Sequence, residues 1–520
     1  MTTDPEETRL SFFGTLSKSS NEIESNRESL LNGTSVQGEN YSVFAVILPF
    51  LFPALGGLLY GYDIGGTSCA TISIQSSSLS GISWYSLNSV EIGLITSGSL
   101  YGALIGSALA FTIADVLGRR RELILAALFY IIGAIVTASA ANYTILVIGR
   151  IVYGIGIGLS MHAAPMYIAE TAPSQIRGRL ISLKEFFIVL GMVAGYGVGS
   201  LFVESLGGWR YIYAISAPLA LTMAAGMWWL PPSPRWLLLC FLQKKKDDEF
   251  LKEQAVTSIN RLRGESVCEN SSLEVELILT DLASVSIEDK VTIKEIFEGK
   301  FLKAITIGCG LVLFQQITGQ PSVLYYAPSI LQVLFINLLT STFTFLYNKQ
   351  SAGFQAASDA TRVSILLGCL KLIMTGVAVL VIDKAGRRPL LLGGVSGMVA
   401  SLFLLGSYYL YFGDVPAVAV FALLLYVGCY QLSFGPIGWL MISEIYPLRM
   451  RGKGLSIAVL VNFGANALVT FAFSPLAAWL GAGVVFYVFG VIAVISVVFI
   501  FFIIPETKGL TLEEIEAKCL

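Results

Sequence analysis

Stretches of mostly apolar residues, each about twenty residues long, recur along most of the chain. A helix needs about 20 apolar residues to cross the roughly 30 Å hydrocarbon core of a bilayer. We place such stretches near residues 44–65, 92–113, 122–141, 144–165, 184–203, 210–230, 302–330, 363–382, 390–411, 417–442, 454–474 and 484–504. The pattern therefore predicts an all-α membrane protein with twelve transmembrane helices.

One long polar interruption divides these stretches into two groups of six. Residues 231–301 hold charged, helix-like sequence such as QKKKDDEF, and we predict a helical linker here. The flanking halves are residues 44–230 and 302–504. Residues 1–43 are rich in Ser, Glu and Asn, which is typical of a disordered tail, and residues 505–520 form a short C-terminal tail.

Lys and Arg fall on one side of the predicted helices. They lie in the loops 118–122, 176–180, 383–389 and 448–454 and in the linker, whereas the opposite loops 66–91, 412–416 and 475–483 contain none. Because cytoplasmic loops carry an excess of positive residues, we predict that both tails and the linker are cytosolic.

The two halves repeat the same motifs. DVLGRRR begins at Asp115 and DKAGRRP at Asp383, 268 residues later, and ETAPSQIRGR begins at Glu170 and EIYPLRMRGK at Glu444, 274 residues later. Two motifs at nearly one offset indicate two halves related by an axis along the membrane normal, with a ligand site between them.

Each motif places acids and arginines at the cytosolic ends of helices. We predict that these charges latch the two halves together on the inner side and that the latch breaks when the protein opens inward. The alternative is that these charges only determine the topology and are otherwise ordinary surface charges. The candidate gating residues are Asp115, Arg119, Arg120, Glu170, Arg177, Asp383, Arg387, Arg388, Glu444 and Arg451.

Composition supports the membrane assignment and excludes several other classes. Hydrophobic residues make up 55% of the 520 positions and charged residues 13%, with a mean hydropathy of +0.74. A soluble protein of this length would carry more charge. Seven cysteines without paired spacing and a single histidine do not suit a metal cluster, and no nucleophile–base pair stands out. We expect no enzyme activity, no metal and no nucleic-acid partner.

These motifs occur together with GGLLYGYDIGG (56–66), PPSPRWLL (231–238), QQITGQPSVLYYAPS (315–329), GPIGWLMISEIYP (435–447) and PETKGLTLEEIE (505–516). The combination, over residues 44–520, resembles the sugar porter family of the major facilitator superfamily. It is similar to plant members described as vacuolar glucose transporters or D-xylose–proton symporter-like proteins. The resemblance implies a monosaccharide substrate, alternating access, and a vacuolar membrane, with the plasma membrane as the alternative. Phe111, Val116 and Pro232 depart from the family motifs, which suggests a weaker latch in the first half.

Several polar and aromatic residues in the predicted helices suit a sugar. Gln315 and Gln316 can both donate to and accept from hydroxyls, although bonds between helices would explain them too. The resemblance places both in direct sugar contact. It also points to polar and aromatic contacts in the second half, namely Asn462, Asn466, Trp439, Phe434 and Phe463.

Asp63, near the end of the first predicted helix, is the candidate proton-coupling residue. A carboxylate at membrane depth favours a proton unless a cation lies nearby, and Arg150 on the fourth helix is the natural partner. An acid that exchanges a proton for an arginine contact is a minimal device for symport. The alternative is a static ion pair, which would leave a passive uniporter. The proton is the only coupling ion expected, without a cofactor.

Lys371 stands near the middle of an apolar segment, where a lysine costs roughly 2.5–3.5 kcal/mol. In the family this position is commonly Asn, and Glu185 stands where relatives commonly have Gln, both of them sugar ligands. We predict that Glu185 and Lys371 pair, directly or through the sugar. The alternative is that Lys371 extends to the membrane surface.

Residues 333–350, VLFINLLTSTFTFLYNKQ, have no counterpart that we recognise in the family. They represent an excursion outside the cytosol or translated intron sequence. The chain as a whole predicts a monomeric, proton-coupled monosaccharide transporter in the lipid bilayer. Its rivals are a passive uniporter and a sugar sensor that does not transport.

Overall fold

The computed structural model describes residues 43–172, 177–243, 249–263, 275–276, 278–279, 298–326, 352–411, 416–446 and 451–508. The predicted N-terminal tail, except for residue 43, and the unusual segment 333–350 lie outside these residues. So do the side chains of Asp115, Arg177, Asp383 and Arg451, although their backbones are helical.

The first half contains six membrane-length helical spans. They are α2 (Val43–Gln75), α3 (Ser89–Leu117), α4 (Arg119–Ala138), α5 (Tyr143–Thr171), α6 (Arg177–Phe202), and the consecutive α7 (Gly208–Ala214) and α8 (Ser216–Trp229). Two further helices, α9 (Pro234–Gln243) and α10 (Glu249–Arg263), lie in the predicted linker.

The second half contains another six spans. They are α13 (Gly299–Ile317) with its continuation to Tyr326, α15 (Ala352–Ala385), α16 (Arg387–Tyr411), α17 (Pro416–Leu432) with α18 (Phe434–Ile445), α19 (Arg451–Leu480) and α20 (Ala482–Ile503). Twelve helices of the described residues are thus long and apolar enough to cross a membrane. The predicted all-α fold with twelve spans is confirmed.

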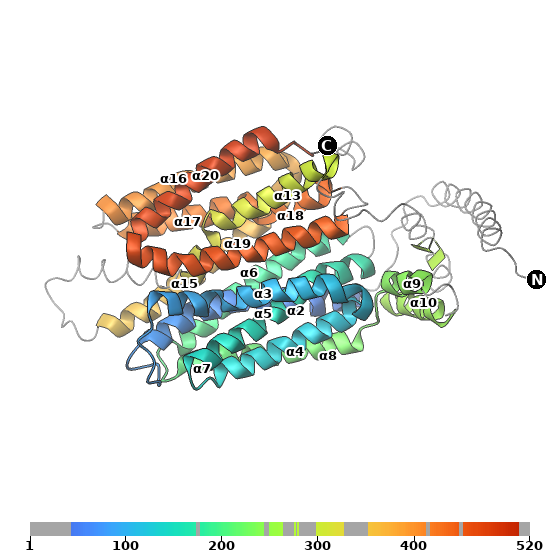
Figure 1. Cartoon of the computed structure of the whole chain (residues 1–520), viewed down its shortest axis with the longest axis horizontal. Coiled ribbons are helices and arrows are strands. Elements are labelled where there is room, and N and C mark those ends of the chain that lie inside the picture. Colours follow the sequence, from blue (N-terminus) through green and yellow to red (C-terminus); the bar gives the residue numbers. More distant parts are fainter. Residues whose placement is uncertain are drawn as a thin grey trace, which may run out of the picture. The chain divides into compact units, whose positions relative to one another are not determined.

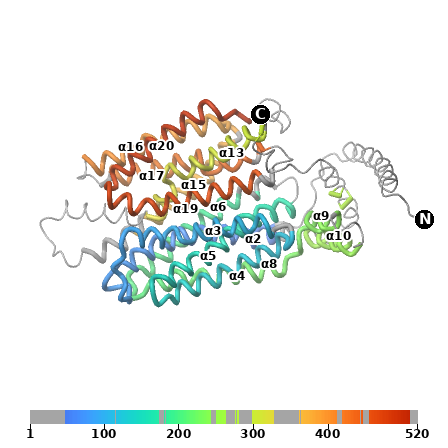
Figure 2. Tube along the Cα trace, in the orientation of Figure 1, coloured from blue at the N-terminus to red at the C-terminus, as the bar shows by residue number. Residues whose placement is uncertain are grey.

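The spans all belong to one compact unit, Leu48–Trp236 with Lys290–Leu520, and a second unit comprises Met1–Ile47 with Leu237–Asp289. Within the unit of the spans, helices α2–α8 form one group and helices α13–α20 the other (Figure 1). The groups meet where α3 packs along α19 and α6 along α15 (Figure 2). The boundary between the halves is therefore lined by helices from both.

Glycines allow several helices of the first half to touch closely. A Cβ added to Gly154 would lie 2.0 Å from the carbonyl oxygen of Ser99, and one added to Gly158 would lie 2.3 Å from that of Ala103. Small residues permit such approach between membrane helices. The glycine-rich segment 153–159 therefore packs α5 against α3.

The first span is longer than its apolar stretch. Helix α2 continues from the predicted end at residue 65 to Gln75, so Asp63 lies inside the span rather than near its end. The added turns contain Ser and Thr, which lower the hydropathy, and Thr71 satisfies its hydroxyl within the helix by donating to the carbonyl of Ser68 (2.9 Å). This depth removes Asp63 further from water than the sequence indicated.

Candidate functional site: a polar cavity between the halves

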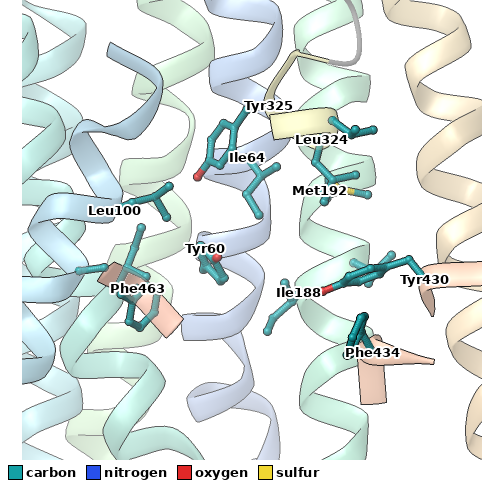
Figure 3. Packing of buried hydrophobic residues seen from close by; sticks show 14 of the residues in the cluster. Tyr60, Ile64, Leu100, Ile188, Met192, Leu324, Tyr325, Tyr430, Phe434 and Phe463 are labelled. Carbon is teal, nitrogen blue, oxygen red and sulfur yellow. The ribbon is translucent and has the colours of Figure 1, made fainter. Parts of the chain in front are cut away.

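A cavity of about 100 Å³ lies between the two halves. A buried water needs roughly 10–15 Å³, so several waters or one small polar molecule fit here. The first half contributes Tyr60, Ile64, Met161, Glu185, Ile188 and Val189, and the second half contributes fourteen residues from four of its spans. Figure 3 labels lining residues of both halves, among them Tyr60, Ile188, Tyr325 and Tyr430.

Two broken helices border the cavity. The seventh span is interrupted at Gly319, whose φ of +91° is favourable for glycine, and Gln320 and Pro321 after the break line the cavity. The tenth span is interrupted at Ser433, between α17 and α18, and Gln431 and Gly435 beside that break also line it. Discontinuous helices are typical of substrate sites in transporters.

The amide residues predicted to bind sugar lie together in the lining of the cavity. The Nε2 atom of Gln316 donates to Oδ1 of Asn462 (2.6 Å), and Nε2 of Gln315 donates to the carbonyl of Phe434 (2.7 Å). Asn466 donates weakly to the hydroxyl of Tyr60 across the boundary (3.4 Å). All four amide side chains line the cavity, so the structure brings together residues separated by up to 151 positions in the sequence.

Three polar atoms of the lining are buried and have no hydrogen-bond partner among the described residues. They are Oε1 of Gln316, Oε1 of Gln431 and the hydroxyl of Tyr325. A buried polar atom without a partner costs about 1–3 kcal/mol, and such atoms usually await a ligand or water. The cavity is therefore built for a molecule that both donates and accepts hydrogen bonds.

The predicted aromatic residues differ in their positions. Trp439 and Phe463 line the cavity, and the ring of Phe463 meets that of Tyr60 edge to face at 6.1 Å. Phe434 does not belong to the lining, is fully buried, and takes part through its backbone carbonyl. Sequence reasoning missed Tyr60, Gln320, Tyr325, Tyr430 and Gln431; a carboxamide within a span was the available signal for Gln431.

Lys371 and Glu185 line the same cavity from α15 and α6. Lys371 is 7% exposed, so it does not extend to the membrane surface. The structure shows no direct ion pair between the two among its described side chains; the carboxylate of Glu185 lies 3.7 Å from Nζ of Lys184 instead. We predicted that Glu185 and Lys371 pair directly or through the sugar. Without a direct ion pair, pairing through a bound molecule stays a prediction.

Asp63 and Arg150 form a bidentate ion pair buried within the first half. Ser99 donates to Oδ2 of Asp63 (2.7 Å) and accepts from Nη2 of Arg150 (2.9 Å), and Nε of Arg150 donates to the carbonyl of Ile95 (3.1 Å). A second cavity, of about 10 Å³, adjoins the pair, and the hydroxyl of Tyr213 in its lining has no described partner. This volume is about that of one water.

Polar contacts join the halves at the end of the bundle where α2 and α6 end, which we call the far end. Ser68 donates to the carbonyls of Leu324 (3.0 Å) and Tyr325 (2.5 Å). Tyr196 also donates to the carbonyl of Leu324 (2.7 Å), and the hydroxyls of Thr96 and Tyr326 lie 2.8 Å apart. The two halves are therefore held together at the far end.

The opposite end, where Arg119 and Arg387 lie, is the arginine end. Here the described ion pairs stay within each half: Arg119 pairs with Glu170 at 3.2 Å and Arg387 with Glu444 at 2.9 Å. These pairs tie α4 to α5 and α16 to α18, so they are not the predicted latch between halves. A latch through Asp115, Arg177, Asp383 or Arg451 stays a prediction.

Two groups of six spans around a polar central cavity define a transporter of the major facilitator type. The family model described as "Sugar (and other) transporter" matches residues 50–518, and the chain belongs to this family. The predicted family and the predicted class, a transporter rather than an enzyme, are confirmed.

Similar proteins agree with this assignment. D-xylose-proton symporter-like 2 of Arabidopsis thaliana is 68% identical over 97% of this chain and 96% of its own length, and D-xylose-proton symporter-like 1 of the same plant is 63% identical over 99% of both. The xylose transporter XylE from E. coli, in a partially occluded inward-open conformation, is 28% identical, with a TM-score of 0.72 over 90% of this chain and 99% of that one.

Proposed function

We propose that the chain is a proton-coupled monosaccharide symporter that works by alternating access. The observation that carries the proposal is the cavity between the halves, lined by amides and by three buried polar atoms without partners. A sugar supplies hydroxyls that donate and accept, and the two lining rings, Trp439 and Phe463, suit its apolar faces. Relatives described as D-xylose–proton symporter-like, and XylE, described as a proton:xylose symporter, support this substrate class.

We assign the binding of sugar to Gln315, Gln316, Asn462 and Asn466, together with Glu185 and Lys371, which line the same cavity. The carboxylate of Glu185 would accept from one hydroxyl and the ammonium of Lys371 would donate to another. Bonds to charged groups are stronger than neutral ones. Binding of sugar would thus connect the two halves and satisfy the charged side chains that face the cavity.

Proton coupling would come from Asp63 and Arg150. When Asp63 takes up a proton its carboxylate no longer balances the arginine, so Arg150 is released to other acceptors and the packing of α2 against α5 changes. A passive uniporter is the second candidate, because all three guanidinium nitrogens of Arg150 already have partners, as a static pair would require.

Charge distribution and the relatives bear on which side of the membrane each end faces and on which membrane it is. The excess of Lys and Arg places the arginine end in the cytosol, so the closed far end would face the outside or a lumen. We propose the vacuolar membrane; a 56% identical relative is described as chloroplastic, which makes the plastid envelope the main rival. We expect a monomer to suffice, because the cavity is formed within one chain.

Proteoliposomes containing the purified full-length chain test the function. Uptake of labelled xylose, glucose and inositol is measured with and without an inward proton gradient, together with the internal pH. Symport predicts accumulation driven by the gradient and a sugar-dependent fall of internal pH. Sugar flux without proton flux would establish the uniporter, and binding without flux would establish a sensor.

A further inference from the structure

His162 and Glu122 form a buried pair that the proposed transport cycle does not use. Nδ1 of His162, on α5, lies 2.9 Å from Oε1 of Glu122, in the first turn of α4. Glu122 is 0% exposed and His162 is 14% exposed. Oε2 of Glu122 is buried and has no hydrogen-bond partner among the described residues. His162 is the only histidine of the chain.

Helices α4 and α5 do not need this pair to hold together. A Cβ added to Gly133 would lie 2.4 Å from the backbone nitrogen of Tyr153, so the helices are in direct contact without a charged bridge. The rings of Tyr130 and Tyr153 are 4.8 Å apart, and Tyr130 bonds to Ser160 at 2.8 Å. A carboxylate in the first turn of a helix is favoured by the helix dipole, but one that is fully buried and keeps an oxygen without a partner among the described residues calls for a further explanation.

Other charges near the pair already have partners or lie apart from it. At the arginine end, Arg119 pairs with Glu170, Arg120 donates to the carbonyls of Met227 and Trp228, and Arg121 is exposed. The remaining ionisable residues of the packed helices towards this end are Asp115 on α3 and Arg177, Arg179, Lys184 and Glu185 on α6, where Lys184 and Glu185 lie 3.7 Å apart, and α8 has none. Among the described residues, the hydrogen-bond partner of the Glu122 carboxylate is therefore the imidazole of His162.

We propose that Glu122 and His162 form a second proton-binding site, separate from Asp63 and Arg150, that exchanges one proton with water at the arginine end. Without that proton the pair is a carboxylate beside a neutral imidazole, with a net charge of −1. With it the pair is neutral overall, whichever group holds the proton. Met161, the neighbour of His162, lines the sugar cavity. A change of charge at the pair thus acts on the helix segment that borders the cavity.

Histidine-selective isotope labelling tests the site directly. The full-length chain, purified with a tag that lacks histidine, gives one imidazole signal in NMR. We expect that signal to change between about pH 5 and 8, the range in which histidine titrates. In Glu122→Gln the dependence of the signal on pH should differ from that of the wild type, because the neighbouring carboxylate is gone. A signal that stays constant over this range, or that titrates identically in Glu122→Gln, would overturn the proposal.

Transport supplies the second readout, which rests on the proposed function. Sugar exchange is measured at equal pH on both sides, at pH 6 and pH 8. Glu122→Gln and His162→Gln should change the ratio of the two rates by the same factor, and the double variant no further. The matched control is Tyr487→Phe, which removes the partly buried contact to Ser407 (2.7 Å) between α16 and α20 and should keep the wild-type ratio. Wild-type ratios in both variants would overturn the proposal. If the wild type moves no sugar, the proposed function fails and the NMR titration alone decides this site.

Discussion

Asp63→Asn removes the charge that balances Arg150 and leaves the shape of the side chain nearly unchanged. The amide oxygen of Asn can still accept from Arg150, and its NH₂ group would face Ser99, whose hydroxyl can accept. The variant therefore mimics a permanently protonated Asp63. Differences from the wild type then report on the lost charge and on the lost bond from Nη2 of Arg150, rather than on packing.

The size of the effect follows from burial. Arg150 is 1% exposed and Asp63 4%, so the weak energies of surface ion pairs, about 0–1 kcal/mol, do not apply. Removing one partner of a buried pair costs about 3–5 kcal/mol, because a buried charge is left uncompensated. At about 1.4 kcal/mol for each factor of ten, the conformation seen here should lose roughly two to four orders of magnitude in population relative to conformations that hydrate Arg150.

Proteoliposome transport and thermal unfolding measure this prediction. Asp63→Asn should abolish accumulation driven by a proton gradient and the accompanying proton uptake, while exchange of sugar between the two sides persists. It should also lower the unfolding midpoint, and Asp63→Asn combined with Arg150→Gln should recover part of that loss, since no charge is then stranded. Accumulation driven by the gradient in Asp63→Asn would refute the assignment, and equal stability of the single variant would refute the buried-charge reasoning.

Three further changes address other parts of the molecule. Glu185→Gln and Lys371→Asn should each lower sugar uptake by at least about tenfold because a charge is stranded, whereas the double variant largely preserves uptake, and equal additive losses would contradict the pairing. Ser68→Ala removes one hydroxyl proton that two carbonyls share across the far end, worth about 0.5–1.5 kcal/mol in all, so spin-label distances there should show a several-fold larger open population. Burial alone would raise the pKa of Glu506, but backbone N–H groups of Lys508, Arg387, Arg388 and Thr507 outweigh it and lower that pKa. Glu506 therefore stabilises the folded chain at neutral pH and loses this contribution as the pH falls through its folded pKa. The difference in unfolding midpoint between wild type and Glu506→Gln should accordingly vanish in acid, and a difference independent of pH would contradict this.

Hydropathy and motif spacing predicted the twelve spans, and the chemistry of a buried acid predicted the partner of Asp63. These inferences succeed because they depend on local composition and on charge, which the bilayer penalises wherever it is unpaired. The position of Asp63 within its span was less accurate. Hydroxyl residues that bond to their own helix extend a span without extending its apolar stretch, and α2 is an example.

The cavity lining was harder to predict because it depends on breaks in helices. The tenth span is interrupted at Ser433. The regular helical spacing of α17 therefore does not predict which way the side chains after the break point. Phe434 is consequently packed in the core, whereas Gln431 faces the cavity. The pair of Glu122 and His162 was missed for a different reason: the two residues lie forty positions apart, and only the packing of α4 against α5 brings them together.

At the arginine end, the two halves share a hydroxyl–glutamate bond and a glycine with positive φ. They differ in the side chain that lies beside this glycine. At an offset of 274 residues, Ser233 bonds to Glu170 as Thr507 bonds to Glu444. At an offset of 268, Gly118 and Gly386 both turn with positive φ, +78° and +92°. Beside Gly386 lies the carboxylate of Glu506, whereas beside Gly118 lies the ring of Trp236.

This difference follows from Pro232, which stands where the second half has Glu506 and carries no charge. In the second half, Glu506 accepts from the backbone N–H groups of Arg387 and Arg388 at 3.1 Å each, at the start of α16. A carboxylate at a helix N-terminus is stabilising, but salt screens it and a proton removes it. The apolar ring of Trp236 beside Gly118 is affected neither by salt nor by a proton. Acid on the arginine side should therefore remove the carboxylate cover beside Gly386 at the start of α16, while the ring cover beside Gly118 stays, so these two covers respond unequally to pH although the sequences of the halves repeat.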